Sequence, residues 1–140
     1  MERQTAPSAE RNKEPILEVL RRVMPPRGVV LEIGSGTGQH VVHFAKALPQ
    51  LTFQPSEMDS SQHASIRAWI AHEQLVNVRP PLAFDVAHLP WPVSQVDAIA
   101  FRRRQRLASR GKIQFWNRFK SDRISVQTEP NLHSRISSVG

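Results

Sequence analysis

The segment VVLEIGSGTGQH, residues 29–40, constrains the fold of this chain more than any other part of its sequence. A short apolar and β-branched run, GVVLEI, ends at residue 33, and three glycines follow on alternate positions, Gly34, Gly36 and Gly38. Such a run is typical of a strand that is buried on both faces. The glycines that follow it indicate either a flexible turn or a loop whose backbone approaches a ligand closely, and we expect the second.

Apolar residues recur at helical spacing on both sides of this segment. They are Ile16, Val19, Leu20 and Val23 before it, and Val41, Phe44, Ala45 and Leu48 after it. The first set predicts a helix over residues 14–23 with Pro15 in its first turn, and the second predicts a helix that Pro49 ends. The expected order is therefore helix, strand, glycine loop, helix.

Strands and helices continue to alternate beyond residue 50. The pattern predicts a strand over residues 51–55, a helix over 62–75, short strands at 77–79 and 82–84, and a buried strand over 96–101. Alternation of this kind predicts an α/β fold built on a parallel sheet. Trp91, which stands between two prolines, is expected to be a packing residue.

Charge divides the chain near residue 100. Residues 101–140 contain ten of the nineteen Lys and Arg and only two of the twelve acids, a net charge of +8, which leaves −1 on residues 1–100. We therefore expect one domain over residues 1–100 and a basic, disordered tail over residues 101–140. The chain has no cysteine, which excludes disulfides, thiolate metal sites and cysteine nucleophiles. No stretch approaches the roughly 20 apolar residues of a membrane span, so we expect a soluble protein inside the cell, cytoplasmic or nuclear.

The glycine loop follows an E-x-G-x-G-x-G pattern that begins at Glu32. A dinucleotide fingerprint requires G-x-G-x-x-G, and a phosphate loop requires a terminal Gly-Lys-Ser/Thr, so neither pattern fits. A carboxylate at Glu32 would repel a pyrophosphate but could attract a cationic amino group, directly or through water. His40 and His43 are spaced for one helix face, but they lack a third ligand at useful spacing, so we predict no metal site.

The segment from Glu32 to Gly38 resembles the first motif of the class I S-adenosylmethionine (SAM)-dependent methyltransferases. More narrowly, SAERNKEPILEVL, VLEIGSGTGQHVVHFAKALP, QPSE and LAFDV together resemble a small methyltransferase-like family of unknown substrate. The resemblance covers about residues 8–100. It implies a Rossmann-like fold, SAM as the cofactor and methyl transfer to an unknown acceptor.

The resemblance also implies a set of cofactor-binding residues. Gly34, Ser35, Gly36 and Gly38 correspond to the loop under the amino acid part of SAM, with Glu32 near its ammonium. Glu57, or else Asp59, corresponds to the acid that binds the ribose hydroxyls, and Asp85 corresponds to the acid that reaches the adenine. Arg11 and Lys13 correspond to cations near the methionine carboxylate. Taken singly, Glu57 and Asp59 could be solvated loop acids, Asp85 a loop acid or helix cap, and Arg11 and Lys13 surface charges. No catalytic residue is identified.

The chain departs from the family after about four of the seven strands expected in a class I methyltransferase sheet. If the strands order as in the family, the strand at residues 96–101 becomes an exposed edge. Three functions follow as alternatives: a methyltransferase, a truncated and non-catalytic isoform, or a module that contacts nucleic acid through the basic residues 101–120. The sequence does not predict an oligomeric state.

Overall fold

The computed structural model describes residues 2–86, 88, 90–93 and 96–102, with side chains to residue 101, and the backbone of residues 119–120 and 124–127. The helices are α1 (Pro7–Val23), α2 (Gln39–Ala47), the 3-10 helix η1 (Ser60–Gln62) and α3 (His63–His72). The strands are β1 (Gly28–Ile33), β2 (Leu51–Ser56), β3 (Ala98–Arg102), β4 (Phe119–Lys120) and β5 (Ile124–Gln127). The predicted order of helix, strand, glycine loop and helix is confirmed.

The sheet has the strand order β2-β1-β3-β5-β4. β1 lies between β2 and β3 and is parallel to both, whereas β5 is antiparallel to β3 and β4. The chain after α3 runs parallel to β2 but forms only isolated bridges, at Val78 and Leu82. Because Pro80 and Pro81 between them lack an N–H, the predicted strands at 77–79 and 82–84 do not form a continuous ladder.

The expectation that the strand at residues 96–101 would be an exposed edge is wrong. β3 pairs with β5 over four residues, with Ile99 opposite Gln127 at one end and Arg102 opposite Ile124 at the other. The four-residue strand β5 is too short to give a periodic signal in the sequence, which is why its partner role was missed. Most of the predicted disordered tail, and most of the segment expected to contact nucleic acid, lies outside the described residues.

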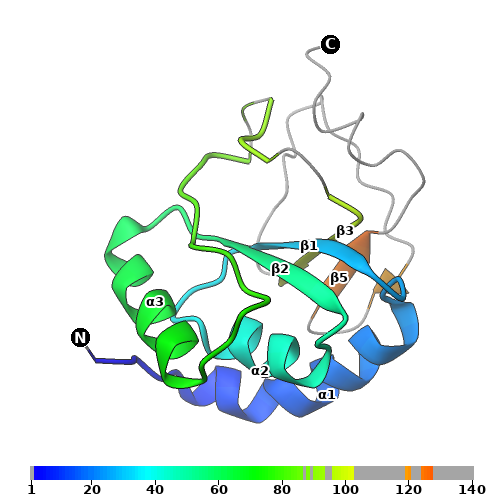
Figure 1. Cartoon of the computed structure of the whole chain (residues 1–140), viewed down its shortest axis with the longest axis horizontal. Helices are drawn as coiled ribbons and strands as arrows, with labels where there is room; N and C mark the ends of the chain where they lie inside the picture. The colour runs from blue at the N-terminus through cyan, green and yellow to red at the C-terminus, as the bar shows by residue number, and fades with distance from the viewer. Residues whose placement is uncertain are drawn as a thin grey trace.

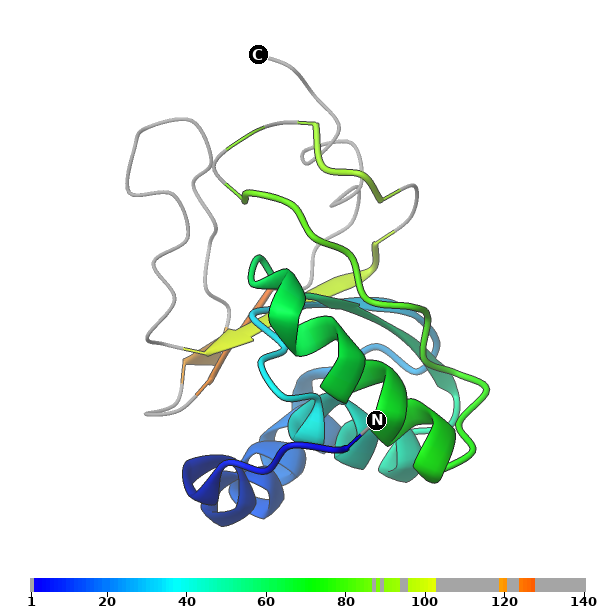
Figure 2. The same cartoon turned by 90° about the vertical axis from the view of Figure 1, so that its left-hand side faces the viewer.

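Two different layers cover the two faces of the sheet (Figure 1). The helices α1, α2 and α3 lie on one face, where Val30, Phe53 and Ala98 join their apolar side chains in the main core. The loop that follows Leu82 crosses the opposite face (Figure 2), where Leu31, Ile33, Ile99 and Phe101 pack against Trp91 and Val96. Trp91 is 4% exposed, so its predicted packing role is confirmed.

Two helices differ in length from their predictions. α1 begins at Pro7 rather than at residue 14, so Pro7 occupies its first turn and Pro15 lies inside it. The added turns are held by packing, since Ala9 is 1% exposed. α3 ends at His72 because Gln74 adopts a left-handed φ of 53°. Among the described residues, no helix combines the length and the apolar character that crossing a membrane requires.

Candidate functional site

The glycine loop connects the carboxyl end of β1 to the start of α2, and each of its glycines is left-handed. The φ angles of Gly34, Gly36 and Gly38 are 75°, 57° and 96°. L-residues rarely adopt these angles, which explains why glycine occupies all three positions. The space available for a side chain, however, differs between Gly36 and Gly38. A Cβ on Gly38 would lie 2.9 Å from the Cα of Ile66 in α3, whereas a Cβ on Gly36 would meet no atom within 4 Å. Gly38 therefore serves the packing of α3, and Gly36 leaves one side of the loop open.

Hydrogen bonds to the end of β2 fix the first half of the loop. The backbone N–H groups of Gly34 and Ser35 both donate to the carbonyl oxygen of Ser56, at 3.0 and 2.9 Å. In return the N–H of Ser56 donates to Oγ of Ser35 at 3.1 Å, and Oγ of Ser56 donates to the carbonyl of Glu32 at 2.7 Å. Ser35 and Ser56 are both buried, so these bonds hold the ends of β1 and β2 together away from water.

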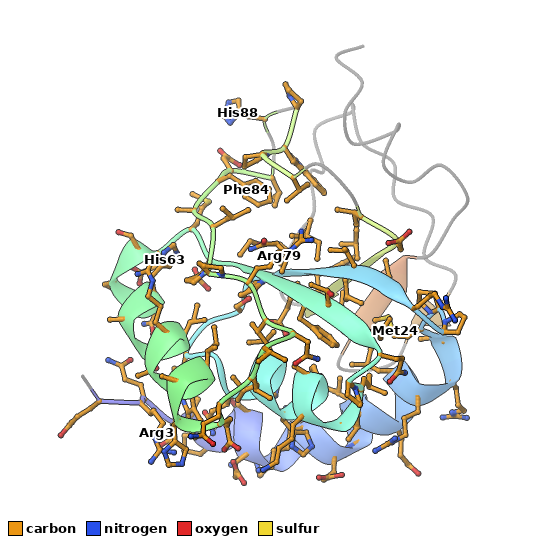
Figure 3. The ribbon with its side chains drawn as sticks, viewed as in Figure 1. Arg3, Met24, His63, Arg79, Phe84 and His88 are labelled. Carbon is orange, nitrogen blue, oxygen red and sulfur yellow. The ribbon has the colours of Figure 1, made fainter. Side chains whose placement is uncertain are left out.

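Glu57 contacts the loop directly. Its Oε1 accepts the N–H of Gly36 at 2.8 Å, and its Oε2 accepts the N–H of Asp59 at 2.9 Å. The backbone carbonyl of Glu57 lies 2.8 Å from Nε2 of His63, which is at the amino end of α3 (Figure 3). The half-buried Glu57 carboxylate is thus placed at the open side of the loop.

Asp59, the alternative to Glu57, has a different position and a structural role. Its Oδ1 accepts the backbone N–H and the hydroxyl of Ser61, at 3.0 and 2.6 Å, and so caps η1. These hydrogen bonds lower the pKa of Asp59 because they favour the carboxylate. Asp59 is exposed. Of the two acids, the structure brings Glu57 to the glycine loop.

Glu32 lies at the same edge of the sheet but faces the helices. It is 8% exposed and lines a cavity of about 10 Å³ together with Gly34, His40 and side chains of α1, α2 and β3. A volume of this size is close to the minimum that one water molecule requires. The Nε2 of His40 lies 3.1 Å from the carbonyl oxygen of Ala9, which ties α2 to α1 beside this cavity.

Asp85 lies in the loop on the other face of the sheet. Its Oδ2 is 3.0 Å from Nδ1 of His88, which lies farther from the sheet than Phe84 does (Figure 3), while Phe84 packs against the apolar side chains on that face of the sheet. The ring of Phe84 packs 5.6 Å from the ring of Trp91, measured between centroids. Asp85 is therefore held on a loop that is anchored by aromatic packing.

The two cations of α1 are not brought to the glycine loop by any described contact. Arg11 is exposed. Lys13 forms an ion pair with Glu10, which lowers the pKa of that carboxyl. Lys13 and Glu10 line a cavity of about 180 Å³ between the helices, together with His43 and Trp69, and none of the loop glycines lines it. Their predicted contact with a methionine carboxylate stays a prediction.

Sequence reasoning gave no role to Ser56, His63 or Ser65, all of which support the loop. Ser65 is 2% exposed, and its Oγ donates to the carbonyl of Thr37 at 2.7 Å. A serine inside a helical pattern carries no signal that its hydroxyl will bond a loop 28 residues away. The described residues contain no group of three or more His, Cys, Asp or Glu that could hold a metal ion.

Comparison with solved structures identifies the fold. YjhP from E. coli superimposes with a TM-score of 0.59 at 22% sequence identity, over 76% of this chain and 42% of that one. The S-adenosylmethionine-dependent methyltransferase SibL gives 0.56 at 22%, over 69% and 27%, and a SAM-dependent methyltransferase from Aquifex aeolicus gives 0.53 at 16%, over 72% and 70%. This chain therefore has the Rossmann-like fold of the class I methyltransferases, and it spans less than half the length of YjhP and SibL.

A family profile matches most of the chain. The match extends over residues 3–109, and so includes α1, the glycine loop, Glu57 and β3. The family bears the description "Protein of unknown function (DUF938)". Because the match covers more than half of its residues, the chain belongs to the DUF938 family.

Proposed function

We propose that this chain binds S-adenosylmethionine over the loop from Gly34 to Gly38 and belongs to a methyltransferase whose acceptor is unknown. The observation that carries the proposal is the placement of Glu57 against Gly36. A left-handed glycine with open space at its Cβ position and a carboxylate on its N–H stand together at the carboxyl ends of parallel strands. Ligands of open α/β folds bind at this edge.

The polar groups around the loop suit the different parts of the cofactor. The Glu57 carboxylate retains lone pairs beyond the two that accept the N–H groups of Gly36 and Asp59, and so can accept hydrogen bonds from ribose hydroxyls. Gly38 directly precedes α2 and has no side chain to cap its first turn, so a ligand carboxylate can accept from the amides there. Glu32 is buried beside a cavity of water size, which suits a water-bridged contact with an ammonium.

The structural neighbours support this cofactor, because SibL and the Aquifex protein are described as SAM-dependent methyltransferases. When bound, SAM supplies a methyl group already activated by its sulfonium, so the protein contributes binding and alignment. In this chain the alignment comes from the rigid frame of Ser35 and Ser56 under the loop. No described residue is assigned as a general base.

Titration calorimetry with S-adenosylhomocysteine (SAH) tests the proposal. The chain should bind SAH with a dissociation constant in the micromolar range, about −8 kcal/mol. Gly36→Val should abolish the heat, because its Cβ has no protein atom within 4 Å and so places the new side chain in the space over the loop, although the left-handed φ of 57° strains any side chain there. Circular dichroism and a thermal melt must show that the variant is folded. Equal binding by wild type and a folded Gly36→Val variant would place the ligand elsewhere, and a folded wild type that gives no heat would refute cofactor binding.

A further inference from the structure

The segment before α1, residues 3–6, passes beside α3 on its way to α1 (Figure 2), and side chains of α3 hold its first two residues. The N–H of Gln4 donates to Oγ of Ser65 at 2.8 Å, and Nε1 of Trp69 donates to the carbonyl of Gln4 at 2.9 Å. The guanidinium of Arg3 lies over the Trp69 ring, with its central carbon 4.7 Å from the ring centroid. Both backbone groups of Gln4 are thus bonded to α3, although the residue itself is exposed.

Ser65 connects this segment to the glycine loop. The hydroxyl that accepts the N–H of Gln4 donates its own proton to the carbonyl of Thr37, which stands between Gly36 and Gly38. A serine hydroxyl has one proton to donate and two lone pairs. Because Ser65 is 2% exposed, water does not replace either bond freely. One buried hydroxyl therefore joins residue 4 to the centre of the loop.

A second connection runs through Gln39, the first residue of α2. Its Oε1 accepts the N–H of Ala6 and lies 3.3 Å from the hydroxyl of Thr37, which donates to it. Its Nε2 donates to Glu10 in α1 at 3.2 Å. Gln39 is 5% exposed. Residues 3–6 therefore reach Thr37 twice, at its carbonyl through Ser65 and at its side chain through Gln39.

We propose that residues 3–6 act as a positioning segment for the glycine loop, and that Ser65 is the positioning residue through which they act. The inference rests on the proposed cofactor site. Glycines on both sides of Thr37 leave the loop many alternative conformations, and a fixed Thr37 carbonyl selects one of them before the ligand arrives. If the segment favours cofactor binding, then bound cofactor must favour the docked segment to the same degree.

Hydrogen exchange of the full chain, without ligand, tests the first half of the proposal. In Ser65→Ala the amides of Gly36 and Gly38 should exchange about fivefold faster, the factor that corresponds to one net hydrogen bond of about 1 kcal/mol. The amides of Gly34 and Ser35 should not change, because both are bonded to Ser56. Ser60→Ala is the matched control, an exposed serine just before α3. Unchanged exchange at Gly36 and Gly38 in the variant would overturn the proposal.

Addition of SAH tests the second half. In the wild type, SAH should slow exchange of the Gln4 amide, and in Ser65→Ala it should not, while the affinity for SAH falls about fivefold. A purely structural role for Ser65 would give no ligand-induced protection at Gln4. Trp69→Phe keeps a ring on α3 but loses the bond to Gln4, so it should change the exchange rates and the affinity for SAH in the same direction as Ser65→Ala. This variant replaces Ser65→Ala in the experiment if Ser65→Ala does not fold. A wild type that fails to bind SAH would refute the proposed function, whereas the exchange without ligand would still decide whether residues 3–6 hold the loop.

Discussion

Replacing Gly36 or Gly38 by alanine should separate ligand binding from folding. Both substitutions place a Cβ at a left-handed φ, 57° and 96°, which costs about 1–2 kcal/mol. At Gly36 nothing lies within 4 Å of the new atom, so this strain is the whole cost. At Gly38 the new atom would lie 2.9 Å from the Cα of Ile66, a backbone atom that cannot move without shifting α3. Overpacking of this kind adds about 1–3 kcal/mol.

The expected loss of unfolding free energy is therefore about 1–2 kcal/mol for Gly36→Ala and about 2–5 kcal/mol for Gly38→Ala. Urea unfolding followed by circular dichroism measures both free energies of unfolding. Equal m-values would show that the two variants expose the same surface when they unfold. Gly38→Ala should lose the larger free energy of unfolding because its new Cβ meets the backbone of α3. Gly36→Ala should stay folded and bind SAH more weakly. Equal stabilities for the two variants would refute the assignment of Gly38 to packing and Gly36 to the ligand.

Two further predictions concern titratable side chains. Glu57→Gln should weaken SAH binding by about tenfold, which corresponds to about 1.4 kcal/mol, because the Gly36 N–H and the ligand lose a carboxylate. Asp59→Asn should change the affinity little in the same calorimetric titration, since Asp59 caps η1. A larger effect of Asp59→Asn than of Glu57→Gln would assign the ribose contact to Asp59. Burial lowers the pKa of His43 despite the nearby Glu14, so the unfolded chain binds this proton more readily. Stability should therefore be complete above the unfolded pKa of about 6.5 and fall as the pH drops through the window below it. Thermal melts between neutral and mildly acidic pH should show a shallower decline in His43→Gln, and an unchanged decline would contradict this cause.

The sequence predicted the part of the fold that local patterns encode. The buried strand β1, the glycine loop and the amphipathic α2 all follow from short-range spacing, and the structure confirms them. The start of α1 was missed because Pro15 resembled a first-turn proline, whereas packing of Ala9 extends the helix to Pro7. The pairing of β3 with β5 joins residues far apart in the chain, and nothing in either short strand indicates its partner.

The candidate site was predictable in its residue types and less so in its roles. The E-x-G-x-G-x-G pattern marked the loop, and the interval from Gly38 indicated an acid near residue 57. Its closeness to the predicted strand favoured Glu57 over Asp59, but the contact of its carboxylate with the Gly36 N–H depends on how the side chain turns, which the sequence does not encode. The bonds of Ser65 and Gln39 to Thr37 were equally hidden, since each depends on how α3 and residues 3–6 pack over the loop.

If the loop from Gly34 to Gly38 forms the floor of a SAM site, as we propose, its glycines must respond to the ligand. The most direct test is a two-dimensional ¹H–¹⁵N NMR titration of the full chain with SAH, because the chain has six glycines and the backbone amide signals of glycine are readily recognised. We expect the signals of Gly34, Gly36 and Gly38 to shift and saturate together, while that of Gly28, at the opposite end of β1, stays in place. A folded chain whose loop glycines do not respond to saturating SAH would show that the loop is not the SAM site.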